Sequence, residues 1–197
     1  MDDEVLSLVR GRTGHFLLES GHHGDLWFDL ETLCLHSRAI QPLAARLAAQ
    51  LKKYNVDAVC GPLVEGAFIA LLVSLELGCD FVYAERFANA TSESLYPVEY
   101  RLPIVLQPTV QGKRVAIVND VINAGSAVRG TFTDLRSRGA VIVAIGALLV
   151  LGDAMAAFAA ENRIALELLK QMPNNLWPPA ECPLCAKGEL PEIVGIS

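Results

Sequence analysis

The 197-residue sequence has no surplus of basic residues. Its 16 lysines and arginines are outnumbered by 22 aspartates and glutamates, so the formal net charge is −6. A protein whose main task is to bind nucleic acid needs a positive surface that neutralises phosphates. The composition therefore argues against nucleic acid as a partner.

The sequence also lacks an apolar run long enough to cross a bilayer. The longest such run, 140–151, lies between Arg138 and Asp153 and is shorter than a membrane span. The first residues, MDDEV, are acidic where a secretory signal would be basic. We therefore expect a cytoplasmic protein with no membrane partner, in which 140–151 forms a buried strand.

Charged residues are few, at 19% of the chain, whereas 52% of the residues are hydrophobic. This balance excludes a disordered or collagen-like chain and predicts a globular domain with an ample core. The five cysteines show no small-disulfide spacing, and a reducing compartment would keep them as thiols. Cys34, Cys60 and Cys79 stand in apolar surroundings and are expected to be small buried side chains.

The other two cysteines, Cys182 and Cys185, stand in ECPLCAKG with the spacing of half a zinc knuckle. Zinc needs four ligands, and no second pair of this kind occurs in the chain. The missing ligands would be isolated residues, such as Cys34 or a histidine, or would come from another subunit. A structural zinc ion, two reduced thiols and a disulfide all remain open.

From residue 56 onward, strand-like runs alternate with helix-like runs. The strand-like runs are VDAVCG, DFVYAER, RVAIVND and AVIVAIGALLVL, and the helix-like runs are GAFIALLVSLELG, SAVRGTFTDLRSRG and DAMAAFAAENR. This alternation predicts an α/β fold, with a mostly parallel twisted sheet covered by helices on both faces. Ligands bind beyond the carboxyl ends of such strands, so a site is expected at 61–66, after Arg86 and at 119–127.

The flanking segments follow other patterns. We expect a short helix at 4–9, a hairpin around the turn-forming residues 20–25, and a helix from Ser37 to near Asn55. The connection 87–110 is long and polar and contains three prolines, which is typical of a lid. The segment 171–197 is rich in proline and lacks periodicity, which indicates an irregular tail appended to a domain at 1–170.

The stretch 114–135 carries the clearest chemical signal. A buried strand ends in Asn119 and Asp120, and the loop 123–127 opens the next helix. Gly125 permits an unusual backbone angle, and free N–H groups at a helix start face the turn. Such a loop can bind a phosphate monoester, and the preceding carboxylate indicates a sugar phosphate. A plain strand-to-helix turn is the alternative.

With these residues the sequence resembles the type I phosphoribosyltransferases, whose fingerprint is an apolar strand, two acidic residues and a Thr/Ala-Gly-Thr/Ser loop. It is similar to the orotate branch of that family at three further places, in the same order along the chain. These places are GHFLLESGHHGDLWFDLE, CGPLVEGAFIA and YAER. Together the matches span about residues 14–153.

The resemblance implies the type I phosphoribosyltransferase fold, with a small N-terminal hood at 12–32 and a lid loop at 87–110. It implies a homodimeric enzyme that transfers ribose 5-phosphate from phosphoribosyl pyrophosphate (PRPP) to a nitrogenous base. Mg²⁺ would be bound through PRPP. Such a reaction belongs to nucleotide biosynthesis or salvage, and in the orotate branch to pyrimidine biosynthesis.

The resemblance also implies roles for individual residues. Asp120, Asn119 and Arg86 would be catalytic, with Asp120 at the ribose hydroxyls and Arg86 near the pyrophosphate, reaching a partner subunit's site. The 5′-phosphate would be held by Asn123, Ala124, Gly125, Ser126 and Ala127. The pyrophosphate would face Gly61, Pro62, Leu63, Val64, Glu65 and Gly66. The base would lie beside Trp27, Phe28, Glu19 and Asp153. Trp27 and Phe28 could instead be ordinary core aromatics, and Arg86 a solvated strand end.

Several positions depart from the orotate pattern. Asn119 replaces the first acidic residue of the fingerprint, Glu19 and Glu65 stand where that branch has lysines, and Asp153 replaces a base-contacting arginine. The stretch 87–103 contains no lysine or histidine. The leaving pyrophosphate gathers negative charge and needs cations or Mg²⁺ around it.

These departures shape the functional hypothesis. Orotate carries a carboxylate that Glu19 and Asp153 would repel, so we expect a neutral or cationic base. Substitute cations are sought among Arg86, Arg101, Arg129 and Lys113. The alternative is a non-catalytic protein that binds PRPP or a nucleotide and acts as a regulator or sensor. His22 and His23 could contact the ligand or simply lie in a surface turn, and His15 and His36 show no pattern.

Overall fold

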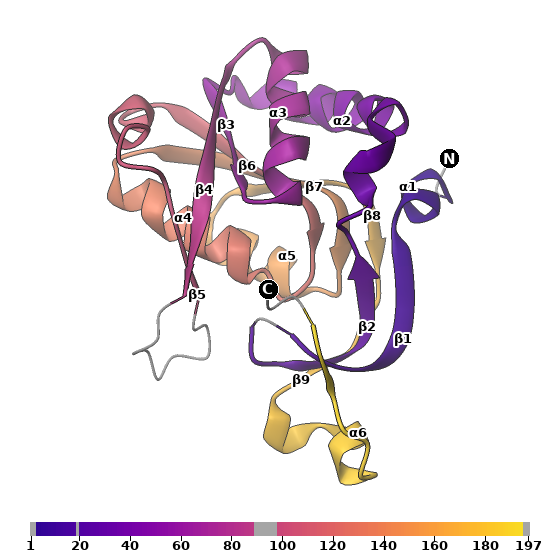
Figure 1. Ribbon diagram of the computed structural model, residues 1–197. Helices are drawn as coiled ribbons and strands as arrows, with labels where there is room; N and C mark the ends of the chain where they lie inside the picture. Colours follow the sequence, from indigo (N-terminus) through magenta and orange to yellow (C-terminus); the bar gives the residue numbers. More distant parts are fainter. Residues whose placement is uncertain (1–2, 19, 89–97, 195–197) are drawn as a thin grey trace.

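The computed structural model describes residues 3–18, 20–88 and 98–194, and Figure 1 shows their arrangement around a central six-stranded sheet. The strand order is β5-β4-β3-β6-β7-β8. The strands are β3 (Ala58–Pro62), β4 (Asp80–Ala88), β5 (Val98–Arg101), β6 (Arg114–Ile122), β7 (Val141–Leu151) and β8 (Ala165–Met172). Only the pair β4–β5 is antiparallel among these neighbours. The predicted mostly parallel sheet is confirmed.

Helices pack on both faces of this sheet. One core cluster joins it to α2 (Ser37–Leu51) and α3 (Glu65–Leu77), and a second joins it to α4 (Ser126–Ser137) and α5 (Ala154–Asn162). The helical spacing expected after Ser37 is confirmed, because α2 buries Ile40, Leu43, Ala44, Leu47, Ala48 and Leu51. Burying each of the leucine and isoleucine side chains contributes about 1.5–3 kcal/mol before entropy costs.

Shorter helices connect these elements. The helix expected near the N-terminus is α1 (Asp3–Leu8). The 3₁₀ helices η1 (Leu33–His36) and η2 (Lys52–Tyr54) flank α2, and η3 (Gln107–Val110) precedes β6. The long apolar run forms β7, which is buried along most of its length, as predicted. Within the described residues, no helix is long and apolar enough to cross a membrane.

The expected hairpin forms a second, smaller sheet that lies beside the carboxyl ends of the central strands (Figure 1). β1 (Arg10–Leu17) and β2 (His23–Asp29) pair antiparallel in this sheet, whose order is β10-β1-β2-β9. Its outer strands, β9 (Leu176–Trp177) and β10 (Glu192–Ile193), come from the tail. We call β1 and β2 with their turn the hood.

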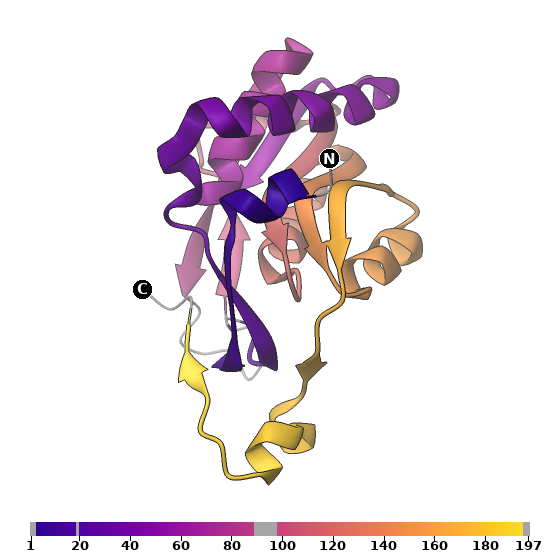
Figure 2. The ribbon, with the colours of Figure 1, turned by 90° about the vertical axis from the view of Figure 1, so that its right-hand side faces the viewer.

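The tail is more regular than the sequence indicated. The edge strand β8, which sequence patterns missed, extends to Met172, across the boundary placed at 170. The chain then descends through β9, turns through η4 (Pro179–Glu181) and α6 (Pro183–Ala186), and returns as β10 (Figure 2). Two-residue strands have no periodicity of their own, because their conformation is fixed by pairing with the hood.

The predicted lid connection is also shorter than 87–110. β4 continues to Ala88, and β5 pairs with it, with Arg86 opposite Tyr100. Residues 89–97 of the connection lie outside the described residues. The antiparallel pairing of β4 and β5 places the described part of this segment at the edge of the sheet.

Candidate functional site

The sheet topology creates a crevice between β3 and β6. These neighbouring parallel strands continue in opposite directions, because β3 leads through α3 to β4 on one side and β6 leads through α4 to β7 on the other. The loops after the two strands therefore diverge and leave a space at their carboxyl ends. Both loops that the sequence singled out, 61–66 and 123–127, lie at this point.

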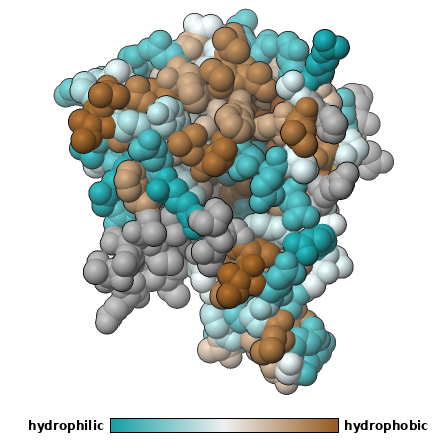
Figure 3. Space-filling model, in the orientation of Figure 1, coloured by the Kyte–Doolittle hydropathy of each residue, from teal (hydrophilic) through white to brown (hydrophobic). Residues whose placement is uncertain are grey.

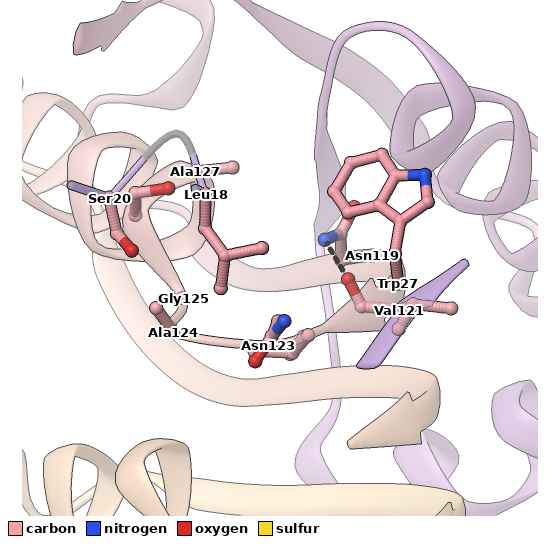
Figure 4. Close-up of a pocket in the computed structure, with 11 residues that line it drawn as sticks. Leu18, Ser20, Trp27, Asn119, Val121, Asn123, Ala124, Gly125 and Ala127 are labelled. Carbon is pink, nitrogen blue, oxygen red and sulfur yellow. Dashed lines mark hydrogen bonds between the residues drawn. The ribbon is translucent and has the colours of Figure 1, made fainter. Parts of the chain in front are cut away.

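The loop 123–127 encloses a small pocket of about 140 Å³. Gly125 has φ 82° and precedes α4, and no side chain among the described residues caps this helix start. The first N–H groups of α4 are thus left for a ligand. Figure 4 shows Leu18 and Ser20 of the hood on one side of this pocket and Trp27 on the other, with Asn123, Ala124 and Gly125 below.

Gly125 is required by its surroundings as well as by its φ angle. A Cβ atom at this position would lie 2.2 Å from Cε of Met155, which is fully buried at the start of α5. The other end of the loop is held by the tail, since Nδ2 of Asn174 donates to Oδ1 of Asn123 at 2.6 Å. The shape of the phosphate-sized pocket is therefore fixed by packing from three segments.

Asn119 and Asp120 end the buried part of β6 beside this pocket. Nδ2 of Asn119 donates to the carbonyl oxygen of Val121 at 3.0 Å. Asp120 is only 3% exposed, and its Oδ2 has no hydrogen-bond partner among the described residues. Burial raises the pKa of Asp120 to about 7, with a smaller contribution from Glu65. A buried, unsatisfied carboxylate oxygen is costly and indicates a missing ligand.

The loop after β3 lines a second, larger cleft of about 820 Å³. Pro62, Leu63, Val64, Glu65 and Gly66 all line it, together with Asn119 and Asp120. Gly66 permits close approach, because a Cβ there would lie 2.0 Å from Oδ1 of Asn119.

Gly61, the remaining member of the predicted pyrophosphate loop, has a packing role. It is not among the described residues that line the cleft. A Cβ at Gly61 would lie 2.6 Å from both Cα of Ala67 and Cβ of Ala70, so this glycine lets β3 approach α3.

The hood supplies the aromatic wall. Trp27 lines both the small pocket and the larger cleft, and its Nε1 donates to Oδ1 of Asp29 at 3.0 Å. Phe28 lines the cleft but is only 6% exposed and also belongs to the main core. Phe28 therefore both packs in the core and lines the cleft, which are the two interpretations that the sequence left open, whereas Trp27 faces the cavities.

The larger cleft is acidic. Four carboxylates line it, from Glu31, Glu65, Glu85 and Asp120. Arg86 is the only lysine or arginine among the described lining residues, and it reaches the cleft from near the end of β4. An anionic ligand in this cleft would meet an unfavourable field unless a cation accompanied it.

Other predicted positions lie elsewhere. Asp153 precedes α5, where its Oδ1 accepts a hydrogen bond from Nε2 of Gln171 at 2.9 Å, and it is not among the described residues that line either cavity. Lys113 pairs with Asp80 at 2.5 Å, and Arg129 stacks on Phe158 at 4.4 Å. Glu19 lies outside the described residues.

Arg101 also has local partners. It pairs with Glu99 and lies over the Phe87 ring, 5.7 Å from its centroid. Of the four cations sought as substitutes, only Arg86 is among the described residues lining the larger cleft.

Sequence reasoning missed several lining residues. Glu31 and Glu85 line the larger cleft, and Leu18 and Ser20 line the small pocket. Tyr100, which the sequence suggested as a residue of the lid that could help close the site, also lines the larger cleft. Glu85 sits next to the predicted Arg86 at the end of β4, so strand-end position could have indicated it. Tyr100 reaches the cleft through the antiparallel β4–β5 pairing, which the sequence did not reveal.

Comparisons with known proteins agree with this geometry. Residues 34–180 match the family model described as "Phosphoribosyl transferase domain". An orotate phosphoribosyltransferase of Thermus thermophilus is 30% identical over 190 residues, covering 94% of this chain and 96% of that protein. One of Caldanaerobacter subterraneus is 27% identical over 175 residues, covering 89% of this chain and 85% of that protein.

Solved structures show the same fold. Orotate phosphoribosyltransferase from Aeropyrum pernix superposes with a TM-score of 0.64 at 20% identity, covering 87% of this chain and 94% of that one. Adenine phosphoribosyltransferase from Thermoanaerobacter pseudethanolicus superposes with a TM-score of 0.66 at 17% identity, covering 86% and 99%. The predicted fold class is confirmed.

Proposed function

The chain belongs to the phosphoribosyl transferase domain family, and we propose that it transfers ribose 5-phosphate from PRPP to a nitrogenous base that carries no carboxylate. The observation that carries this proposal is the phosphate-sized pocket at Gly125, with the unsatisfied Asp120 carboxylate beside it and a larger cleft next to both. These three adjacent features match a ligand with a phosphate, a sugar and a second charged group.

The ligand would lie along the crevice from one loop to the other. Backbone N–H groups at 123–127 would bind the 5′-phosphate, with the Ser126 hydroxyl as a further donor. Asp120 and Asn119 would accept hydrogen bonds from the ribose hydroxyls. The segment 62–66 would face the pyrophosphate with Arg86, and Trp27 would lie against the base.

The cleft fits Mg²⁺ bound together with PRPP. Magnesium prefers carboxylate and phosphate oxygens, and Asp120 offers an oxygen that has no partner among the described residues. Bound there, Mg²⁺ would neutralise charge on the pyrophosphate. It would compensate for the scarcity of positively charged side chains.

In the transfer itself, the bond from the sugar C1 to the pyrophosphate oxygen breaks, and a bond from C1 to a base nitrogen forms. Pyrophosphate leaves with the bonding electrons, the sugar becomes cation-like, and the proton released from the base nitrogen passes to the pyrophosphate or to water. Asp120 would stabilise that positive charge, because a carboxylate in a buried site acts more strongly than in water. Arg86 would stabilise the departing pyrophosphate, and the hood would exclude water from C1.

The charge of the cleft supports a base without a carboxylate. The sequence relatives are named for orotate, an anion, yet Glu31, Glu65 and Glu85 line the same cleft as Trp27. Each carboxylate close to a bound anion raises the free energy of the complex. A neutral or cationic base avoids this repulsion.

A second copy of the chain would complete the assembly. The exposed side of α3 presents Phe68, Leu71 and Leu75, and Val64 precedes the helix with 54% exposure. Apolar residues gather over α3 in Figure 3. Because α3 starts at the pyrophosphate loop, pairing along this face would place the sites of two protomers near the interface.

Sedimentation velocity tests the homodimer. Leu75 is 69% exposed, and Leu75→Asp should convert a dimer to monomers by burying a charge at the interface. Leu190→Asp, at a 90% exposed tail position, is the matched control and should leave the dimer intact. A wild-type protein that sediments as a monomer at assay concentrations would contradict the proposal.

Pyrophosphate release tests the reaction. Purified protein is incubated with PRPP and Mg²⁺ and with a panel of neutral, cationic and anionic bases. We expect release that depends on both PRPP and a base, with kcat/KM for orotate at least about tenfold below that for the best uncharged base. Orotate as the best substrate would contradict the proposed base class but not the transfer.

One other outcome favours a different function. The described lining of the cleft has a single arginine on the pyrophosphate side. A regulator that binds PRPP without transferring it has no leaving group to stabilise, so it needs fewer cations there than an enzyme does. PRPP binding by calorimetry without pyrophosphate release from any base would indicate such a sensor. No binding and no release would contradict both functions.

A further inference from the structure

Four side chains from the two ends of the chain meet beneath the hood, away from the crevice. They are His15 of β1, His23 of β2, and Cys182 and Cys185 at the start and end of the tail turn. Their potential ligand atoms all lie within 4.8 Å of one another, and the first three residues are buried. We propose that these four residues bind one structural Zn²⁺ ion, which fastens the tail to the hood.

The distances suit tetrahedral zinc. Nε2 of His15 lies 3.3 Å from Sγ of Cys182 and 3.9 Å from Sγ of Cys185. Nδ1 of His23 lies 3.3 Å from Sγ of Cys185 and 2.9 Å from Nε2 of His15. Zinc bonds of about 2.0–2.1 Å to nitrogen and about 2.3 Å to sulfur require ligand atoms roughly 3.3–3.8 Å apart in a tetrahedron. These four distances lie within about half an ångström of that range, and the most widely separated ligand atoms, up to 4.8 Å apart, would move closer by about 1 Å on binding zinc.

The tautomer of His15 is already set for a metal. Its Nδ1 lies 2.8 Å from the carbonyl oxygen of Glu189, so Nδ1–H donates to this oxygen and the lone pair is on Nε2. Zinc-binding histidines commonly donate their second N–H to a carbonyl or carboxylate in this way. The Glu189 carbonyl, only a few residues after Cys185, thus orients the imidazole from within the tail.

A hydrogen-bond network explains the cluster less well. Nε2 of His15 has a single lone pair, yet three polar atoms converge on it, namely Nδ1 of His23 and the two cysteine sulfurs. One lone pair satisfies one donor, whereas a metal ion in the centre would satisfy all four groups at once.

The charges also balance. Both thiols lose their protons when they bind zinc, and two thiolates with two neutral imidazoles give an uncharged site around Zn²⁺. A neutral site is compatible with the burial of His15, His23 and Cys182.

The position of this site links it to the hood. His15 and His23 lie on the two paired strands, whereas Cys182 and Cys185 lie more than 150 residues later in the sequence. The tail also joins the hood through the short pairings of β9 and β10, the hydrogen bond from Nδ2 of Asn175 to Asp25, the ion pair of Arg12 with Glu192, and a small apolar cluster. Zinc would cross-link these segments, and the hood places Leu18 and Trp27 at the phosphate pocket.

Metal analysis tests the site directly. Protein purified without a metal-affinity step or chelator should contain about one zinc ion per chain by mass spectrometry. The Co²⁺-substituted protein should show the visible absorption of a tetrahedral site and thiolate-to-metal charge-transfer bands. Metal-free protein with two titratable thiols at 182 and 185, or with a disulfide between them, would overturn the proposal.

Variants identify the ligands. Cys185→Ser changes the exposed ligand, and His23→Asn a buried one, and each should lower zinc content at least about tenfold. The matched controls are Cys34→Ser, in η1, and His22→Asn, adjacent in the hood turn, which should keep the metal. Zinc retained by Cys185→Ser would contradict this ligand set. If a ligand variant does not fold, the Co²⁺ spectrum of the wild-type protein decides.

Chelation tests what the metal does. A strong chelator should lower the thermal unfolding midpoint of the wild-type protein by several degrees but leave that of Cys185→Ser unchanged. An unfolding midpoint that stays constant after the zinc has left the wild-type protein would contradict its role in fastening the tail.

Discussion

The two ends of the crevice meet negative charge by different means. At the β6–α4 end, the backbone forms the pocket, with Gly125 at φ 82° and the uncapped start of α4. At the β3–α3 end, side chains dominate, and the described lining includes Glu65 and Glu85 with only one arginine, Arg86. The first end offers fixed partial positive charge, whereas the second carries a net negative charge.

This difference separates binding from chemistry. Backbone amides can bind a phosphate without a charged side chain, so the first end needs only the correct loop shape. The second end must accommodate a leaving group whose charge grows during the reaction. Mg²⁺ bound with PRPP would neutralise part of that charge here. Changing the loop shape at the first end should therefore abolish PRPP binding. Changing the charge at the second end should alter the affinity for pyrophosphate only moderately.

The largest effect is expected from Gly125→Ala. The variant strains a backbone with positive φ and brings a Cβ atom against the terminal methyl group of Met155, which must shift, so we expect the phosphate pocket to deform. We expect PRPP affinity, measured by calorimetry, to fall at least about 100-fold. Gly112→Ala is the matched control, since Gly112 has φ 72° but its Cβ would meet no described atom within 4 Å. Equal losses in both variants would mean that general destabilisation, not the pocket, is responsible.

Next in size is Asp120→Asn, at the junction of the two ends. The amide keeps the shape but removes the charge next to the ribose hydroxyls and Mg²⁺, so PRPP affinity should fall roughly 10- to 100-fold. Asp80→Asn changes the same charge at the far end of the sheet, where Asp80 pairs with Lys113, and should leave affinity unchanged. Unaltered PRPP affinity in Asp120→Asn would refute the role of this carboxylate.

Stability should move in the opposite direction. Burial raises the pKa of Asp120 from an ordinary 3.8 to about 7, so between these values the folded protein binds more protons than the unfolded chain. The contribution of Asp120 to the free energy of unfolding therefore falls as pH rises from about 4 to about 7. Above that range Asp120→Asn should unfold at a higher temperature than the wild-type protein while binding PRPP less well. A lower unfolding temperature would contradict this explanation.

A smaller effect is expected from pH on binding. Burial raises the pKa of Asp120 to about 7, so PRPP affinity should rise between about pH 6 and pH 8 by up to roughly tenfold, as its ionised fraction grows. The phosphates of PRPP titrate in the same range, and Asp120→Asn measures that contribution alone. Identical pH profiles for the two proteins would show that Asp120 does not titrate at the site.

The two ends also differ in how far the sequence predicts them. The loop 123–127 was predictable because strand, acidic residue, glycine and helix follow one another within a short stretch, and local rules fix their geometry. The position of Glu31 at the cleft was not predictable, and for Tyr100 the sequence suggested only a place in the lid, because the path of the chain after β2 and the β4–β5 register bring these residues to the cleft. Register depends on contacts between distant segments, which a single sequence does not display.

The same reason explains the tail. Cys182 and Cys185 were visible as half of a metal site, but His15 and His23 had no metal-ligand spacing, being eight positions apart. They meet because β1 and β2 pair and because β10 returns along β1. Likewise β8 is an edge strand whose residues are mostly half-buried, so it lacks the continuous apolar run that marked β7. In each case tertiary pairing, not local pattern, determined the outcome.

The smallest effect is expected from Glu65→Gln, which removes one negative charge from the acidic end without changing the side-chain shape. Glu65 begins α3 and lines the cleft, so the field at a bound pyrophosphate should become less repulsive. Solvent screens this partly exposed position, and we expect pyrophosphate affinity, measured by product inhibition, to increase only about threefold. Glu161→Gln, on the exposed end of α5, changes the net charge equally and should have no effect. If both variants bind pyrophosphate alike, the acidic end does not act locally, and the contrast between the two ends of the crevice reduces to net charge.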